Sequence, residues 1–79
     1  MVPPELAIEI ISTGQTFGQM TQKAGYYLTG NVLRVWIVDP EAKSVTVFYP
    51  DRAPVTYMGE GVITDDLFPE LSVAIDRLF

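Results

Sequence analysis

The segment at residues 5–11 constrains the fold most, because it is apolar on both faces of an extended chain. Leu6, Ile8 and Ile10 alternate on one side, with Ala7, Glu9 and Ile11 on the other. Strands of this kind are typical of a sheet whose two faces are both covered, often by helices. We therefore expect an α/β fold in which this segment is one strand of a covered sheet.

A helix is predicted directly after this strand. Thr16 followed by Gln19 forms a capping-box pattern, which places the start of the helix near residue 17. Apolar residues then recur along one stripe at helical spacing. The stripe consists of Phe17, Met20, Ala24, Tyr27 and Leu28. Gly30-Asn31 supplies the left-handed residue expected where the helix ends.

Three more strands are predicted, at residues 32–38, 44–49 and 55–58. Because a helix connects the first two strands of the chain, these are expected to be parallel, with a right-handed crossover. The short turn at residues 39–43 makes the next pair antiparallel. The predicted architecture is a strand–helix–strand unit followed by an antiparallel meander.

The two ends of the chain carry weaker patterns. Residues 2–4 are expected to be extended because they contain two prolines. Residues 59–70 are interpreted as mostly loop, with a brief extended piece at residues 62–63. Ser72 is predicted to cap a short helix that ends in Leu78-Phe79.

Composition narrows the possible chemistry. The 79 residues suffice for one small domain, and an apolar fraction of 48% excludes a disordered chain. The absence of Cys and His excludes disulfides, zinc sites and histidine-based acid–base catalysis. Any bound metal must be a hard cation held by oxygen. The net charge of −5 argues against a chain that wraps nucleic acid by charge alone.

Location and assembly follow from the apolar pattern. No apolar run is long enough to span a membrane, and no basic-then-apolar leader is present, so a cytoplasmic protein without a membrane partner is expected.

The strand at residues 5–11 begins so early that no preceding segment is expected to supply a neighbour. An apolar strand edge left open invites pairing with another copy, so a homo-oligomer is expected.

Glu9 is the first candidate for a functional residue, since an ionised carboxylate in the middle of an apolar strand loses hydration unless it is paired. One interpretation is that its face is exposed or that a neighbouring cation satisfies it. The other is a metal-binding or proton-transfer role, because buried carboxylates often mark functional sites. Both interpretations stay open at this stage.

Lys23 and Tyr27 are the candidates on the predicted helix, where they lie one turn apart. Lys23 is interpreted either as a lysine whose stem covers the core and whose ammonium reaches water, or as a cation beside Glu9. A carboxylate for a hard metal and a lysine that stabilises phosphoryl charge are parts of phosphodiester hydrolysis. Tyr27 is more typical of a core residue than of a reacting group.

Four other sequence features receive structural interpretations. Trp36 is expected in the core, and Asp39 before Pro40 is expected to form a turn. Asp65-Asp66 is interpreted as a solvated acidic pair, although two acids can attract a cation. Residues 59–61 are too short to cradle a phosphate, and no phosphate-binding or dinucleotide fingerprint is present.

A family resemblance rests on spacing. Residues 3–12, with Glu9 near their end, are followed by a lysine fourteen positions after the glutamate, a tyrosine four later, and Val35-Trp-Ile-Val-Asp-Pro40. This pattern resembles the C-terminal half of the Uma-type endonuclease family, a branch of the PD-(D/E)xK restriction-endonuclease-like fold. The resemblance runs through nearly all of residues 1–79, which form a single domain that resembles a truncated nuclease.

The resemblance implies a metal-dependent DNA endonuclease. It makes Glu9 a catalytic acid and Mg²⁺ ligand, Lys23 the replacement for the lysine usually found two residues after that acid, and Tyr27 a further site residue. Position 11, the usual lysine position, is Ile11. Ser12-Thr13-Gly14 departs from the Ser-Pro-Ser of the family. The family's upstream aspartate lies in an N-terminal region to which no part of this sequence corresponds.

Two hypotheses of different classes follow. In the first, the chain is a DNA nuclease domain that is inactive alone, because Glu9 by itself does not provide the two carboxylates expected at a magnesium site. In the second, it is a non-catalytic module that associates with itself. A third possibility is regulation by pairing with longer relatives.

Overall fold

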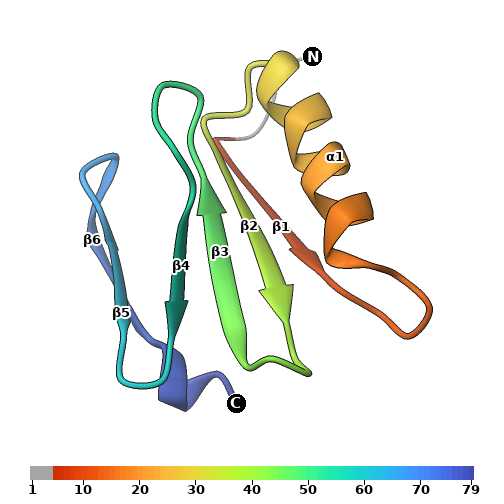
Figure 1. Ribbon diagram of the computed structural model, residues 1–79. Coiled ribbons are helices and arrows are strands. Elements are labelled where there is room, and N and C mark those ends of the chain that lie inside the picture. The colour runs from red at the N-terminus through yellow and green to blue at the C-terminus, as the bar shows by residue number, and fades with distance from the viewer. Residues whose placement is uncertain (1–4) are drawn as a thin grey trace.

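The computed structural model describes residues 5–79, which form a four-stranded sheet, one α-helix and a separate two-stranded hairpin (Figure 1). The extended conformation predicted for residues 2–4 lies outside the described residues. Within the described residues, no helix is long and apolar enough to cross a membrane. The architecture is therefore α/β, as predicted from the sequence.

The four-stranded sheet is mixed. Its strands are β1 (Leu6–Ile10), β2 (Arg34–Asp39), β3 (Ser44–Phe48) and β4 (Val55–Met58), and they lie in this order across the sheet. β1 and β2 are parallel, and the other two pairs are antiparallel. The predicted strand–helix–strand unit and meander are confirmed, and β1 lies at an edge of the sheet.

Helix α1 (Phe17–Thr29) begins and ends where the sequence indicates. The Thr16 hydroxyl accepts a hydrogen bond from the Gln19 amide at 3.1 Å, and the Gln19 side-chain oxygen accepts one from the Thr16 amide at 2.9 Å. This is the predicted capping box. Beyond the helix, Asn31 has a φ of 70°, so the asparagine rather than Gly30 takes the left-handed conformation.

One half of the core lies between α1 and the sheet. Met20 and Ala24 are buried there against Val32, Val35 and Ile37. Of the other residues on the predicted helical stripe, Tyr27 and Leu28 are partly buried and Phe17 is exposed. The stripe therefore contacts the sheet mainly through its middle, and it covers only one face of β1.

The segment at residues 59–70, predicted as mostly loop, belongs to a hairpin; the extended piece predicted at residues 62–63 is confirmed and is longer than expected, and the loop interpretation of the remainder is corrected. β5 (Val62–Asp65) and β6 (Phe68–Ala74) pair antiparallel, with an irregularity between residues 63 and 65. Ser72 lies inside β6, and the predicted helix is reduced to one 3₁₀ turn, η1 (Ile75–Arg77), without a side-chain cap. The hairpin forms because Ile63 and Ile75 bury their side chains against the sheet, a tertiary effect that overrides weak local propensity.

The second half of the core lies between the sheet and this hairpin, on the face opposite α1. Its buried residues are Trp36, Val45, Val47, Tyr49, Ile63 and Ile75. The prediction that Trp36 is a core residue is confirmed. Leu6 of β1 packs against this cluster, but Ile8 and Ile10, which point to the same face, stay exposed, so the hairpin covers β2 and β3 and leaves most of β1 uncovered. The expectation that both faces of β1 are covered is thus wrong for this face.

A buried ion pair joins the hairpin to the sheet. Arg34 Nε lies 2.6 Å from Asp65 Oδ2, and the side chains are only 11% and 2% exposed. The Leu67 amide donates to the other carboxylate oxygen of Asp65 at 2.9 Å. The guanidinium of Arg34 lies 4.9 Å from the centre of the Tyr49 ring, and that of Arg52 lies 4.0 Å from it. The interpretation of Asp65 as a solvated acid is therefore wrong.

This environment determines the charge of Asp65. Burial acts to raise its pKa, but the hydrogen bonds from Arg34 and the Leu67 amide outweigh burial and hold the pKa of the carboxyl below its usual range. A lowered carboxyl pKa stabilises the folded state above the unfolded-state pKa. That stability is lost as the pH falls through the folded-state pKa.

We expect Asp65→Asn to lower the free energy of unfolding by about 3 kcal/mol at neutral pH, because it leaves the Arg34 guanidinium nearly buried without its carboxylate. Urea unfolding followed by circular dichroism measures this change. The matched control is Asp66→Asn, at the exposed neighbouring acid, which should change stability by no more than about 0.5 kcal/mol. Equal losses for the two variants would contradict a structural role for the Arg34–Asp65 pair.

Candidate functional site

Glu9 lies in the middle of β1, next to Ile37 of β2 in the parallel register. Its strand neighbours Ala7 and Ile11 pack against the α1 side of the core. Since side chains alternate along a strand, Glu9 points to the same face, under the helix. The glutamate is therefore partly buried, and its side chain is 21% exposed.

Lys23 and Tyr27, one turn apart on α1, both reach the same oxygen of Glu9. Lys23 Nζ lies 3.1 Å from Glu9 Oε1, and the Tyr27 hydroxyl donates a hydrogen bond to Oε1 at 2.5 Å. The three side chains that the sequence singled out thus form one group, which we name the acid–lysine–tyrosine cluster. Lys23 is half-exposed, so its ammonium contacts both the carboxylate and water.

The cluster shifts the pKa of each of its members. The hydrogen bond from Tyr27, followed by that from Lys23, holds the pKa of Glu9 below its usual range. The hydrogen bond to Glu9 raises the pKa of Lys23 and the pKa of Tyr27. At neutral pH the cluster therefore contains a carboxylate, an ammonium and a neutral phenol.

These protonation states limit what the cluster can do. A protonated Lys23 does not act as a general base, but it can bind an anionic oxygen and stabilise charge that develops there. The Tyr27 hydroxyl donates to Glu9 and so fixes the position of the carboxylate. Among the described residues, both hydrogen bonds to Glu9 go to Oε1, which leaves Oε2 for a further ligand.

The cluster does not amount to a complete metal site. Within residues 5–79, no group of three or more aspartate, glutamate, histidine or cysteine side chains is placed to hold a metal ion. Magnesium takes six oxygen ligands, and Glu9 supplies a single carboxylate. The residues described here therefore do not fit a resident Mg²⁺ by themselves.

The other candidates from the sequence have structural roles. The Asp39 carboxylate accepts hydrogen bonds from the amides of Glu41 and Ala42 at 3.1 and 3.2 Å, so it forms the predicted turn. Gly59 has a φ of 61° and lies in the connection between β4 and β5. Asp65 belongs to the buried ion pair described above. None of these residues joins the acid–lysine–tyrosine cluster.

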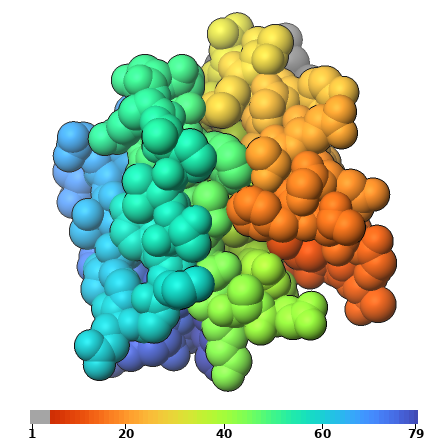
Figure 2. All heavy atoms as spheres, viewed as in Figure 1, coloured from red at the N-terminus to blue at the C-terminus, as the bar shows by residue number. Residues whose placement is uncertain are grey.

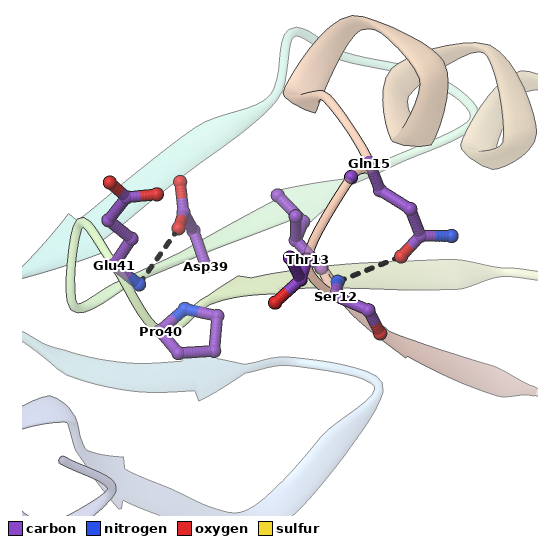
Figure 3. A pocket seen from close by; sticks show the side chains of 8 residues that line it. Ser12, Thr13, Gln15, Asp39, Pro40 and Glu41 are labelled. Carbon is purple, nitrogen blue, oxygen red and sulfur yellow. Dashed lines mark hydrogen bonds between the residues drawn. The ribbon is translucent and has the colours of Figure 1, made fainter.

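A shallow groove of about 550 Å³ lies where β1 and β2 end (Figure 3). The residues labelled in the figure are Ser12, Thr13, Gln15, Asp39, Pro40 and Glu41. The sequence analysis did not predict this groove, although the carboxyl ends of parallel strands are a common place for ligands. Two acidic side chains and no basic one line it, which is unfavourable for a phosphate. The Gln15 side chain accepts from the Ser12 amide at 2.8 Å and so stabilises the loop.

The structure defines a class of protein: an α/β domain with an acid on an edge strand and a lysine and a tyrosine that contact it from the following helix. A comparison with family models matches residues 1–76 to the Uma2 family, described as "Putative restriction endonuclease". The chain belongs to this family. The resemblance seen in the sequence is thereby confirmed.

A solved structure agrees with this assignment. The chain is similar to a protein from Anabaena variabilis described as "a putative nuclease belonging to DUF820", with a TM-score of 0.86 and 25% sequence identity. The similarity covers 100% of this chain and 45% of that protein, so the chain spans about half of the relative's length. A comparison with the curated proteins finds no match.

Tyr27→Phe is expected to raise the pKa of Glu9, because it removes the hydrogen bond that contributes most to lowering it. Lys23→Met should also raise this pKa, because it removes both a hydrogen bond and a positive charge. Titration of the Glu9 side-chain carboxyl by carbon-detected NMR measures both changes. Tyr26→Phe is the control, since Tyr26 is exposed on the same helix, and it should leave the Glu9 titration unchanged. An unchanged pKa in Tyr27→Phe would contradict the geometry of the cluster.

Proposed function

We infer that the acid–lysine–tyrosine cluster is this chain's share of a site for metal-dependent hydrolysis of DNA phosphodiesters. The observation that carries this proposal is the convergence of Lys23 and Tyr27 on one oxygen of Glu9. Membership of a family described as restriction endonucleases supports the choice of DNA as the substrate. It also supports a restriction-endonuclease-like origin for the partial fold.

Each residue of the cluster has a defined role in this proposal. Glu9 presents an ionised carboxylate whose second oxygen is a ligand for Mg²⁺. Lys23 places a permanent positive charge next to that carboxylate, where it binds a phosphate oxygen. Tyr27 is a positioning residue, because its hydroxyl holds the carboxylate under the helix.

The single chain is proposed to be inactive on its own. Only one carboxylate belongs to the cluster, and the residues described do not form a complete Mg²⁺ site. Binding of DNA is also weakly supported by charge, because the chain has five basic and ten acidic residues. Two of the basic residues, Lys23 and Arg34, are already in ion pairs. A second carboxylate and further positive charge must come from outside residues 5–79 of a single copy.

Titration with Mn²⁺, a paramagnetic substitute for Mg²⁺, tests the metal role of Glu9. We expect weak binding that broadens the amide resonances around Glu9 in NMR spectra, and loss of this broadening in Glu9→Gln. Glu41→Gln removes an acid from the groove instead and should leave the broadening around Glu9 intact. If the wild-type resonances around Glu9 do not broaden even at millimolar Mn²⁺, the proposed metal role is wrong.

A plasmid-nicking assay tests the second part of the proposal. With Mg²⁺ present, the purified chain is expected to cleave no faster than Glu9→Gln or Lys23→Ala. Cleavage by the wild-type chain that both substitutions abolish would show that this chain, alone or paired with a copy of itself, suffices for the reaction. That result would overturn the proposed need for residues from outside the chain.

A further inference from the structure

The outer edge of β1 has unpaired backbone groups within the part of the chain that the structure describes. The Arg34 amide donates to the carbonyl of Glu5 at 3.0 Å, and the Ile11 amide donates to that of Val38 at 2.9 Å. The backbone amides and carbonyls of the odd-numbered residues in this segment therefore point toward β2. In a parallel ladder the amides and carbonyls of Leu6, Ile8 and Ile10 then point away from β2, toward the open edge.

The side chains of the same edge are apolar on one face. Ile8 is 53% exposed and Ile10 is 58% exposed, while their register partners Trp36 and Val38 lie over the buried core. Across the sheet, Ile8 and Trp36 lie in one row with Val47. This row of apolar side chains ends at Ile8, on the open side of β1 that the hairpin does not cover.

α1 does not cover this surface, because it packs on the opposite face of the sheet. Figure 2 shows residues of α1 and of the segment before it on one side of the molecule and the β4–β6 residues on the other. The edge of β1 and the edge of β4 therefore lie on opposite sides of the sheet. A strand added to β1 extends the sheet without displacing the hairpin.

We propose that two copies of this chain pair through their β1 strands, antiparallel and centred on Ile8, to form one continuous eight-stranded sheet. In this register Ile8 lies opposite the partner's Ile8, and Leu6 lies opposite the partner's Ile10. Every such pair is apolar and uses the outward amides and carbonyls described above. The two-fold symmetry closes the assembly at two copies on this edge.

The sequence of β1 favours this register over its neighbours. On the helix face, Glu9 lies opposite the partner's Ala7, which leaves room for the carboxylate. A register centred on Glu9 would place two carboxylates directly opposite each other, which is destabilising. In a parallel pairing, one copy would be rotated about the strand direction so that the faces of its sheet are exchanged. Its face with Glu9 would then lie beside Ile8 and Ile10 of the other copy. Self-complementarity therefore identifies the second copy as the occupant of the edge.

The pairing has a consequence for the acid–lysine–tyrosine cluster. Glu9 and the partner's Glu9 become diagonal neighbours on the same face, with backbones about 7–8 Å apart. This distance is within reach of long side chains, so the partner supplies the second carboxylate that a single chain lacks. This consequence, unlike the pairing itself, rests on the function proposed above.

Solution mass tests the pairing. Light scattering over a concentration series should approach twice 8.8 kDa, and added salt should strengthen the association, because each copy carries a net charge of −5. Ile8→Glu places two like charges at the centre of the interface and should return the mass to 8.8 kDa. Met58→Glu is the matched control: Met58 is 55% exposed on β4, and this variant should keep the mass of the pair.

A mass of one chain at all concentrations would overturn the proposal and leave the edge for a different polypeptide. A mass that rises without limit, or that Met58→Glu reduces, would overturn it in favour of open-ended pairing between β1 and β4. Cysteine cross-linking gives a second test that does not depend on Ile8→Glu folding. The natural chain has no cysteine, so Ile8→Cys should form covalent dimers with a short bis-maleimide, whereas Met58→Cys should not.

The shared carboxylates are tested separately by Mn²⁺. Binding around Glu9 should tighten at least several-fold as the protein concentration passes through the dimerisation range, and Ile8→Glu should abolish this tightening. A confirmed dimer whose Mn²⁺ affinity does not change with Ile8→Glu would overturn the shared site and leave the pairing intact. If the wild-type chain does not bind Mn²⁺ around Glu9 at any protein concentration, the proposed function is wrong instead.

Discussion

The parallel register of β1 and β2 is the constraint on which the rest of the structure depends. Because the two strands run in the same direction, the chain must return along one face of the sheet, and α1 makes this return. The helix then lies over Glu9 and brings Lys23 and Tyr27 to its carboxylate. Among residues 5–79, β1 pairs only with β2, so its other side is an open edge. The candidate site and the open edge thus lie on the same strand.

The two faces of the sheet are completed by different kinds of interaction. On the helix side, Met20 and Ala24 pack against branched residues of the sheet side, and the partly buried Glu9 forms an ion pair with the half-exposed Lys23. On the other side, the hairpin depends on the Arg34–Asp65 ion pair as well as on apolar contacts. This pair fixes the hairpin over β2 and β3. Ile8 and Ile10 stay exposed as a result, so the position of one buried charge pair determines which apolar surface is available to a partner.

The function proposed for the chain follows from what the cluster contains and what it lacks. An ionised Glu9, a protonated Lys23 and a neutral Tyr27 suit binding at a phosphate, and the family assignment points to DNA. One carboxylate is too few for a magnesium site. The residues that complete such a site are therefore proposed to lie outside residues 5–79, and a second copy is one source of them. The edge of β1 is the place where the proposed second copy supplies them.

The sequence by itself determined the local elements and the candidate residues, because capping boxes, helical stripes and strand alternation are signals between near neighbours. Thr16 and Gln19 located α1, and the spacing of Glu9, Lys23 and Tyr27 indicated the family and the cluster. Only the tertiary structure decided the hairpin and the role of Asp65. Residues 62–74 show no clear strand alternation beyond residues 62–63, and they pair as strands where Ile63, together with Ile75 of the following turn, covers the sheet. Asp65 looks like a solvated acid until a guanidinium 31 residues away in the chain lies beside it, a contact that no local pattern encodes.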